Sequence, residues 1–196
     1  MENIILASSS PRRQEILKSM GLPFQVAMPN IDESAFISKN ASELPEILAK
    51  AKVQAVVRSR PPKQVIPWVL GADTLVVMGN KIYGKPKDHQ EAFDFLSALQ
   101  DRTHQVITAL ALYNGRTHLT SVRSAVTKVT FAPMSKDEIE WYIDTGDWHG
   151  AAGGYRIQGM ASCFITKIEG TNSCVVGLPI FELYDMLKEQ GYSIVS

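Results

Sequence analysis

Short apolar runs along this chain predict β-strands, and segments with apolar residues three and four positions apart predict helices between them. The predicted strands cover residues 4–7, 22–29, 68–78, 104–113, 116–131 and 163–168. The predicted helices cover residues 11–20, 42–60, 88–99, 135–146 and 180–190. A chain of 196 residues with this pattern is long enough for a single α/β domain or for two small lobes.

The first predicted strand leads through three serines, Ser8–Ser10, into a helix that begins at Pro11. The last serine is a favourable N-cap, Pro11 suits the first helical position because it has no N–H group to leave unpaired, and Gly21 ends the helix. Arg12 and Arg13 stand in the first turn, where positive charge opposes the helix dipole. Either a bound polyphosphate, held by helix N–H groups and serine hydroxyls, compensates for this charge, or both arginines are simply solvated. The spacing alone leaves the two interpretations open.

Four charged residues between the second and third predicted strands are candidates for the same site. Asp32 and Glu33 follow a predicted strand end, where α/β proteins place ligand chemistry, although an acidic surface loop has the same sequence. Lys50 and Lys52 lie in the predicted helix that follows. Because residues two apart point to different faces of a helix, we expect at most one of these lysines to join a site.

The most apolar run of the chain, residues 68–78, contains a single carboxylate, Asp73. An unpaired carboxylate in a buried strand is unfavourable by several kcal/mol, so a cation or a strong hydrogen-bond donor should lie beside it. The alternative is a side chain that binds the backbone at a kink near Gly71.

A Gly-Asn pair at residues 79–80 predicts a two-residue hairpin turn after this strand. Counting back from the turn places Thr74 opposite Lys85, which makes Lys85 a neighbour of Asp73 in space. A strict pleat would set these two charges on opposite faces of the ribbon, so a shared site requires a bend, for which Gly84 is suited.

Twenty basic and twenty acidic residues cancel, so no overall field attracts the chain to nucleic acid or to an anionic membrane. Any phosphate binding must therefore be local. The sequence shows neither a secretory leader nor an apolar run of membrane-spanning length, and we expect a cytoplasmic protein. Cys163 and Cys174 lack metal-ligand spacing, so we expect reduced, structural thiols and no zinc site.

The candidate residues together suit polyphosphate chemistry with a metal. Mg²⁺ binds one or two protein carboxylates, here Glu33 and Asp73, and it lowers the pKa of a bound water so that a carboxylate can take its proton. The stretch from Gly150 to Gly159 has enough glycine for backbone to approach a ligand closely. It lacks the standard phosphate-binding glycine patterns, however, and a flexible loop has the same composition.

Five motifs, in order along nearly the whole chain, resemble those of the Maf family of nucleoside triphosphate pyrophosphatases. They are Leu6–Arg13 (LASSSPRR), Gly71–Thr74 (GADT), Gly84–Pro86 (GKP), Tyr155–Gly159 (YRIQG) and Val176–Pro179 (VGLP). The resemblance implies an α/β fold like that of inosine triphosphate pyrophosphatases, with an elongated mixed β-sheet, surrounding helices and two lobes with a central cleft. It also implies a single Maf-type domain over residues 1–196.

The resemblance further implies hydrolysis of a nucleoside triphosphate between its α and β phosphates, with a divalent cation, Mg²⁺ or Mn²⁺. The products would be a nucleoside monophosphate and pyrophosphate. The matching positions are Asp73 as proton acceptor, Lys52 and Lys85 as catalytic cations, Ser8, Arg12 and Arg13 as phosphate contacts, and Glu33 with Asp73 as metal ligands. The nucleotide is the expected partner, without nucleic acid or membrane, and a homodimer is compatible with the resemblance.

Three positions divide this family by substrate. Arg12, Thr74 and Gln158 are similar to the branch that acts on dTTP and UTP, whereas the branch that acts on 7-methyl-GTP tends to carry Trp, Gln and Glu there. The Gln158 amide offers both a donor and an acceptor, as a pyrimidine edge with O4 and N3–H requires. Arg156 stands where this branch usually has glycine, and we expect an additional cation there to widen the range of bases accepted.

Two other functions stay open on the sequence alone. The family resemblance also suggests a nucleotide-binding regulator of cell division or septum formation, for which hydrolysis would be incidental. The presence of Asp73 and Lys85 favours the enzyme over the regulator. A protein that only binds a nucleotide needs the cations more than it needs the acid. A pyrophosphatase for 7-methyl-GTP or another modified nucleotide would keep the chemistry and change the base.

Overall fold

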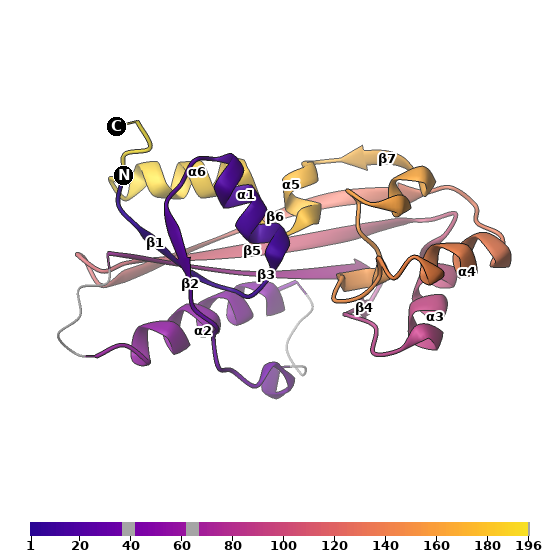
Figure 1. Ribbon diagram of the computed structural model, residues 1–196, viewed down its shortest axis with the longest axis horizontal. Helices are drawn as coiled ribbons and strands as arrows, with labels where there is room; N and C mark the ends of the chain where they lie inside the picture. Colours follow the sequence, from indigo (N-terminus) through magenta and orange to yellow (C-terminus); the bar gives the residue numbers. More distant parts are fainter. Residues whose placement is uncertain (37–41, 62–66, 196) are drawn as a thin grey trace. The chain divides into compact units, whose positions relative to one another are not determined.

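The computed structural model describes residues 1–36, 42–61 and 67–195. Within these residues, seven strands form one sheet in the order β2-β1-β3-β5-β6-β7, with β4 paired to β3 (Figure 1). The strands are β1 (Ile4–Ala7), β2 (Phe24–Val26), β3 (Trp68–Met78), β4 (Lys81–Tyr83), β5 (Thr103–Asn114), β6 (Leu119–Phe131) and β7 (Ile165–Glu169). The α-helices are α1 (Pro11–Ser19), α2 (Leu44–Arg58), α3 (His89–Leu99), α4 (Lys136–Asp144), α5 (Asn172–Val176) and α6 (Ile180–Glu189). Short 3₁₀ helices are η1 (Glu33–Phe36), η2 (Ala152–Gly154) and η3 (Met160–Phe164).

The sheet is mixed, because its strands run in both directions. β1 pairs in parallel with β2 and β3, whereas β4 is antiparallel to β3 and β7 is antiparallel to β6. The expectation of an α/β fold with a mixed sheet and surrounding helices is therefore confirmed. In the described part of the chain, no helix is both long enough and apolar enough to cross a membrane.

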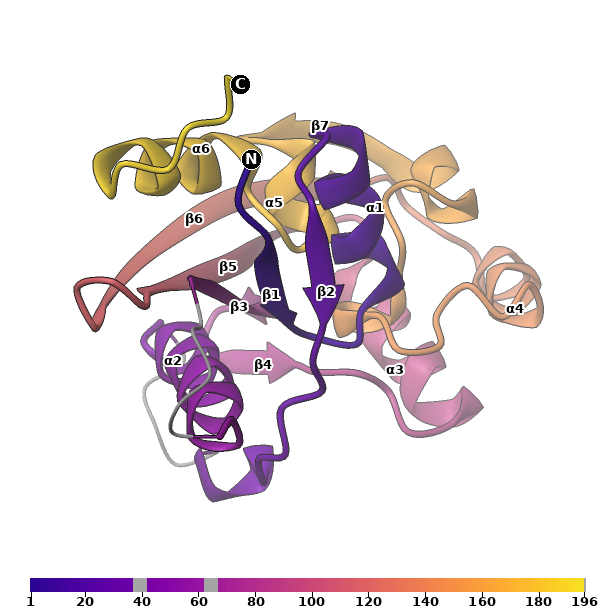
Figure 2. The ribbon, with the colours of Figure 1, turned by 60° about the vertical axis from the view of Figure 1, so that its left-hand side comes forward.

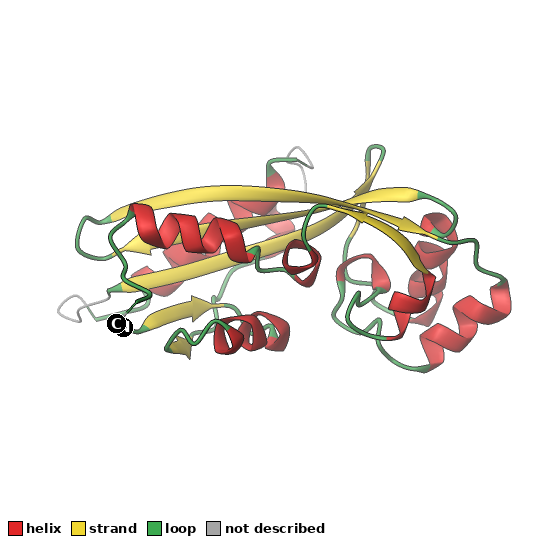
Figure 3. Cartoon of the chain, turned by 90° about the horizontal axis from the view of Figure 1, so that it is seen from above, coloured by secondary structure: helices red, strands yellow, loops and turns green. Residues whose placement is uncertain are grey.

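The chain divides into two compact units. Unit 1 comprises residues 1–73, 108–125 and 177–196, and unit 2 comprises residues 74–107 and 126–176. The long strands β3, β5 and β6 each contribute residues to both units. Figure 3 shows the chain from above, with strands in yellow and helices in red. The expectation of one domain over residues 1–196 stays a prediction, as does the central cleft.

In unit 1, alternate residues of the strands face two different helical layers. Ile4 and Leu6 of β1 pack in one apolar cluster with α1 and α6. Ile5 and Ala7 of the same strand pack in another cluster with α2. Because side chains alternate across a strand, one apolar run supplies both layers of the core. Figure 2 shows α1 and α6 on one side of these strands and α2 on the other.

Unit 2 has an apolar core of its own, rich in aromatic side chains. Phe95 of α3 packs edge-to-face on Tyr83 of β4, with 5.2 Å between the ring centroids. Tyr155 packs in the same way on Phe131, at 4.9 Å. The buried His104 shares a hydrogen bond of 2.7 Å between its Nε2 and the Tyr155 hydroxyl, and burial lowers the pKa of His104 to about 4. This histidine is therefore a neutral part of the core near pH 7.

Several element bounds differ from those predicted. The predicted strand over residues 22–29 is only β2, because Pro23 and Pro29 have no N–H group to give to the ladder. The predicted strand over residues 163–168 begins at Ile165, since Cys163 lies in η3. α2 ends at Arg58, so the prediction that this helix closes before Pro61 is confirmed. Both cysteines are free thiols, as expected.

The hairpin after β3 confirms the turn at residues 79–80 but not the full predicted register. The ladder ends three pairs from the turn, so the predicted pairing of Thr74 with Lys85 is wrong. Beyond the ladder, the Gly84 carbonyl accepts a hydrogen bond from the N–H of Gly153 at 2.9 Å. The chain thus leaves β3 in order to pair with the glycine-rich segment.

Candidate active site

β1 ends beside the middle of its parallel neighbour β3, and this brings Asp73 close to the serine turn. The last pair in the register of β1 with β3 is Ala7 with Gly71. Ser8 follows β1 directly, and Asp73 lies two residues further along β3. Because α/β proteins place ligand chemistry at the carboxyl ends of parallel strands, the place where β1 ends beside β3 is the candidate active site of unit 1.

The helix after the serine turn begins at Pro11, as predicted, and is followed by Gly21 in the left-handed conformation. Ser10 occupies the N-cap position, but its side chain makes no capping hydrogen bond, so the predicted cap is wrong in this respect. The N–H of Ser10 donates instead to Ser8 Oγ at 3.3 Å. Since no acidic residue stands in the first turn of α1, the positive end of its dipole has no compensating charge on the helix itself.

Arg13 turns inward from this first turn. Its Nη1 donates to Ser8 Oγ at 2.9 Å, and its Nε donates to the Gly177 carbonyl at 2.8 Å. The residue is only 9% exposed. Burial lowers the pKa of Arg13, and the carboxylates of Asp73 and Glu33 oppose that shift. Arg13 is therefore a buried cation in a fixed position, and the interpretation that both arginines are solvated is wrong for this one.

Lys52 of α2 joins two acidic side chains from different parts of the chain. Its Nζ lies 2.6 Å from Asp73 Oδ1 and 2.8 Å from Glu33 Oε1. The side chains of Lys52 and Asp73 are 8% and 9% exposed, whereas that of Glu33 is 48% exposed. The predicted cation beside Asp73 is thus confirmed and comes from Lys52. Lys50 is exposed, as expected of a residue on another face of the helix.

Asp73 has one carboxylate oxygen bound to Lys52 and one that is not. Its Oδ2 is buried and has no hydrogen-bond partner among the residues that the structure describes. Burial raises the pKa of Asp73, although Lys52 and Arg13 act against the rise. A carboxylate with a raised pKa and an unpaired oxygen is suited to accept a proton from water.

The two adjacent acids of the loop before η1 make different contacts. Asp32 Oδ1 accepts hydrogen bonds from the hydroxyl of Ser34 at 2.6 Å and from its N–H at 3.0 Å. These bonds lower the pKa of Asp32 and hold the loop in shape. Glu33 reaches Lys52 instead, so Glu33 is the member of the pair that belongs to the site.

Gly71 lets α2 approach β3 closely enough for Lys52 to reach Asp73. A Cβ atom at position 71 would lie 2.6 Å from the Ala49 carbonyl oxygen and 2.7 Å from Val53 Cγ2. Lys52 lies between these two contacts along α2. The missing side chain therefore sets the distance between the helix and the strand.

We expect Gly71→Ala to lower the free energy of unfolding by about 1–3 kcal/mol, because α2 must withdraw from the strand. Urea denaturation followed by circular dichroism measures this loss. Gly84→Ala is the matched control, since a Cβ there meets nothing within 4 Å. It should change stability by less than about 0.5 kcal/mol. An unchanged unfolding midpoint for Gly71→Ala would show that the helix is not held against the strand at this point.

Three of the predicted site residues, Thr74, Lys85 and Gln158, belong to unit 2. Thr74 is half-buried, whereas Lys85 and Gln158 are exposed. The predicted proximity of Lys85 to Asp73 stays a prediction, as does the part that these three residues play in the site. Arg12 belongs to unit 1, where it is half-buried in the first turn of α1.

Two contacts of functional side chains were not predicted from the sequence. The Gly177 carbonyl that holds Arg13 lies 164 positions away along the chain, and a backbone carbonyl has no signature in the sequence. In unit 2, Asp147 Oδ1 lies 3.6 Å from Arg156 Nη1. An acid upstream of an arginine is too common a pattern to indicate such a pair.

The donor set of the site fits a hard divalent cation. Glu33 and Asp73 supply carboxylate oxygens in the number that Mg²⁺ takes from proteins, and Asp73 Oδ2 is a buried oxygen without a hydrogen-bond partner in the described chain. Within that part of the chain, no three His, Cys, Asp or Glu side chains gather as a metal cage. A cation here would therefore take further oxygens from phosphates and water, and its binding stays a prediction.

An α/β sheet with buried cations and a buried carboxylate where a parallel strand ends is typical of proteins that bind phosphorylated ligands. The model of a family described as Maf-like protein matches residues 3–190. This chain belongs to that family, which confirms the resemblance inferred from its five motifs.

Known proteins that are similar to this chain over nearly their whole length share one name. It is 46% identical over 195 residues to the dTTP/UTP pyrophosphatase of Desulforamulus reducens, with 100% of both chains covered. It is 45% identical over 194 residues to the dTTP/UTP pyrophosphatase of Symbiobacterium thermophilum, covering 99% of this chain and 97% of the relative. Among solved structures, the Staphylococcus aureus Ham1 protein has a TM-score of 0.45 and 16% identity over 67% of this chain and 72% of its own, which is too weak a likeness to carry an argument.

Proposed function

We propose that this protein hydrolyses dTTP and UTP to the nucleoside monophosphate and pyrophosphate. The observation that carries the proposal is Asp73, whose Oδ1 is held by Lys52 while its buried Oδ2 has no hydrogen-bond partner within the described residues. Arg13, buried in a fixed position and electrostatically coupled to that carboxylate, supplies positive charge for a phosphate. Membership in the Maf-like family, and the activity after which similar proteins are named, support the substrate class.

In this reaction Asp73 accepts the proton of the attacking water. The water oxygen forms a bond to the α-phosphorus, and its proton passes to Asp73 Oδ2. The bond from the α-phosphorus to the oxygen that bridges it to the β-phosphorus breaks, and pyrophosphate leaves with that oxygen. Lys52 keeps the carboxylate oriented through Oδ1. Burial raises the pKa of Asp73 and so brings its proton affinity closer to that needed near neutral pH.

The remaining charges of the site would neutralise the phosphates. Arg12 and Arg13 stand at the N-terminus of α1, where the helix dipole also favours negative charge. Together with Lys52, the two arginines supply three positive charges, and the carboxylates of Glu33 and Asp73 supply two negative ones. The net charge of plus one is less than a triphosphate requires. A divalent cation, Mg²⁺ or Mn²⁺, held by Glu33 and Asp73 would supply the rest and lower the pKa of a bound water. We propose Lys85 as a further cation and Ser8 as a phosphate contact.

We propose that base selection depends on Thr74 and Gln158, together with Arg12. The Gln158 amide can donate to O4 of uracil or thymine and accept from N3–H. Gln158 is exposed on its turn and is therefore available to a ligand. Cytosine presents the opposite pattern, with an amino donor at position 4 and an acceptor at N3.

Turnover of the purified protein with dTTP, UTP, CTP, 7-methyl-GTP and ATP tests this function, with Mg²⁺ or Mn²⁺ present and the products identified by phosphorus NMR. We expect monophosphate and pyrophosphate from dTTP and UTP, with kcat/KM roughly tenfold or more above that for CTP. Excess chelator should abolish turnover, and added Mg²⁺ or Mn²⁺ should restore it.

Each other outcome of this panel contradicts a separate part of the proposal. Release of orthophosphate would move the cleavage to the γ-phosphate. Tight binding of dTTP without turnover would favour a nucleotide-binding regulator. Preference for 7-methyl-GTP would reject the assigned base, and activity that survives chelation would remove the cation. A homodimer and a cytoplasmic location stay predictions, which light scattering and cell fractionation would test.

A further inference from the structure

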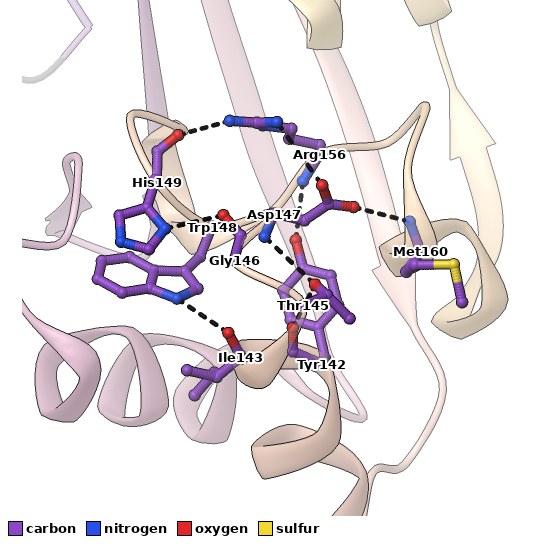
Figure 4. Close-up of polar contacts among 9 residues, drawn as sticks. All are labelled: Tyr142, Ile143, Thr145, Gly146, Asp147, Trp148, His149, Arg156 and Met160. Atoms are coloured by element: carbon purple, nitrogen blue, oxygen red, sulfur yellow. Dashed lines mark hydrogen bonds and ion pairs between the residues drawn. The ribbon is translucent and has the colours of Figure 1, made fainter.

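One carboxylate, that of Asp147, contacts both Arg156 and Met160 (Figure 4), which lie on either side of Gln158 in the sequence. The N–H of Gly159 donates to the Arg156 carbonyl at 3.1 Å, which closes a turn with Gln158 at its third position. Arg156 Nη1 lies 3.6 Å from Asp147 Oδ1, and the N–H of Met160 donates to Asp147 Oδ2 at 3.1 Å. The Asp147 carboxylate thus bridges the residues on either side of Gln158.

Arg156 is fixed by two further contacts. Its Nη2 donates to the His149 carbonyl at 2.8 Å, and its backbone N–H donates to the hydroxyl of the fully buried Tyr142 at 3.2 Å. The Arg156 side chain is 33% exposed, so these contacts are only partly screened by water. Nη1 and Nη2 therefore face acceptors of the protein itself, whereas the buried Nε has no hydrogen-bond partner among the described residues.

Hydrogen bonds hold the segment that contains Asp147. Its backbone N–H donates to Thr145 Oγ1 at 3.2 Å, and the indole N–H of Trp148 donates to the Ile143 carbonyl at 3.1 Å (Figure 4). A Cβ atom at Gly159 would clash with Asp147 Oδ2, so glycine leaves the space that the carboxylate occupies. The position of the Asp147 carboxylate is thus determined by hydrogen bonds on its own segment and by the absence of a side chain at Gly159.

A glutamine amide can present its donor and acceptor either way round, because rotation by half a turn exchanges them. This rotation is about the amide's own side-chain bond, so the base that Gln158 accepts depends on where the turn places the amide beside the base edge. Discrimination between the bases requires that the turn be held in one conformation.

We propose that Arg156 is a positioning residue that acts through Asp147. It holds the turn of Gln158 and thereby sets the preference for uracil and thymine over cytosine, an inference that rests on the proposed function. The charge of Arg156 is compensated by Asp147. Arg156 thus narrows the range of bases that the protein accepts. From the sequence, we expected an additional cation at this position to widen that range.

Steady-state kinetics of the full-length Arg156→Gln, Asp147→Asn and double variants with dTTP and CTP test this role. We expect the ratio of kcat/KM for dTTP to that for CTP to fall roughly tenfold in each single variant and no further in the double variant. Arg156→Lys, which keeps a charge for Asp147, should restore part of the ratio. Arg123→Gln is the matched control, because Arg123 is another partly exposed arginine that pairs with Asp185 and should leave the ratio unchanged.

Amide hydrogen exchange at Gly159 and Met160 gives a second readout that needs no turnover, and it should quicken in both single variants. An unchanged ratio in both, or additive losses in the double variant, would overturn the inference. An equal rise in KM for every nucleotide with Arg156→Gln would also overturn it, because it would make Arg156 a phosphate contact. If the unmodified protein turns over none of the nucleotides, the proposed hydrolysis is wrong, whatever the role of Arg156. The role of Arg156 is then tested by the ratio of the dissociation constants for dTTP and CTP.

Discussion

Asp73→Asn is expected to lower kcat for dTTP by about 10²–10⁴-fold, because an amide cannot take the proton of the attacking water. The fold should be retained, since the amide oxygen can still accept from Lys52, and Glu33 lies 2.8 Å from the same lysine. Burial raises the pKa of Asp73, so kcat/KM of the unmodified protein should fall as the pH drops through that pKa. The residual activity of the variant should lose this dependence. Turnover across a series of pH values measures both effects.

Asp185→Asn is the matched control for this experiment. Asp185 is a partly exposed acid that pairs with Arg123 and not with a residue of the site, so its variant should keep the kcat of the unmodified protein. Circular dichroism separates loss of fold from loss of chemistry. A folded Asp73→Asn protein with undiminished turnover would remove Asp73 from the catalytic step.

Lys52→Met should lower the free energy of unfolding by about 3–5 kcal/mol near neutral pH, because it leaves the Asp73 carboxylate buried without its cation. The methionine keeps most of the volume of the lysine stem, so the loss reports on charge rather than on a cavity. Lys50→Met is the matched control two residues away, on an exposed face. It should change stability by less than about 0.5 kcal/mol. Urea denaturation gives both values.

The loss in Lys52→Met should shrink as the pH falls. Without the lysine, the pKa of Asp73 in the folded protein rises further above its value in the unfolded chain. The loss of unfolding free energy in Lys52→Met is therefore complete at pH values above the pKa of Asp73 in the folded variant. It becomes smaller as the pH falls through that pKa, because Asp73 then takes up a proton. Removing the charge as well, in Lys52→Met with Asp73→Asn, should recover most of the stability at neutral pH. A single variant as stable as the unmodified protein would show that the pair contributes nothing to folding.

Elements with local signals could be predicted from the sequence. The strand predicted over residues 68–78 coincides with β3, because an unbroken apolar run needs no distant partner to be recognised. The helix predicted over residues 135–146 begins with a capping box, which is present in both directions between Ser135 and Glu138. It depends only on four consecutive residues, and the same holds for the two-residue turn after β3.

The types of residue in the site could be predicted from the sequence, but not which of them are in contact. Burial required a cation beside Asp73, and counting along the hairpin indicated Lys85, whereas the structure places Lys52 there. The helix that carries Lys52 reaches the strand because Gly71 leaves room for it, and such packing is not visible in a linear pattern. The opposed charges of Arg156 and Asp147 likewise meet only because their segments fold back on one another.

The hydrogen bond from Arg13 to the Gly177 carbonyl also determines when the site can form during synthesis. The two residues are 164 positions apart, and Leu178 and Leu183, just after Gly177, are fully buried in the same apolar cluster as α1. The serine turn, Lys52 and Asp73 all leave the ribosome long before this closing segment. A nascent chain that has not yet reached Gly177 therefore carries the acid and the cations of unit 1 but lacks the carbonyl that holds Arg13 Nε.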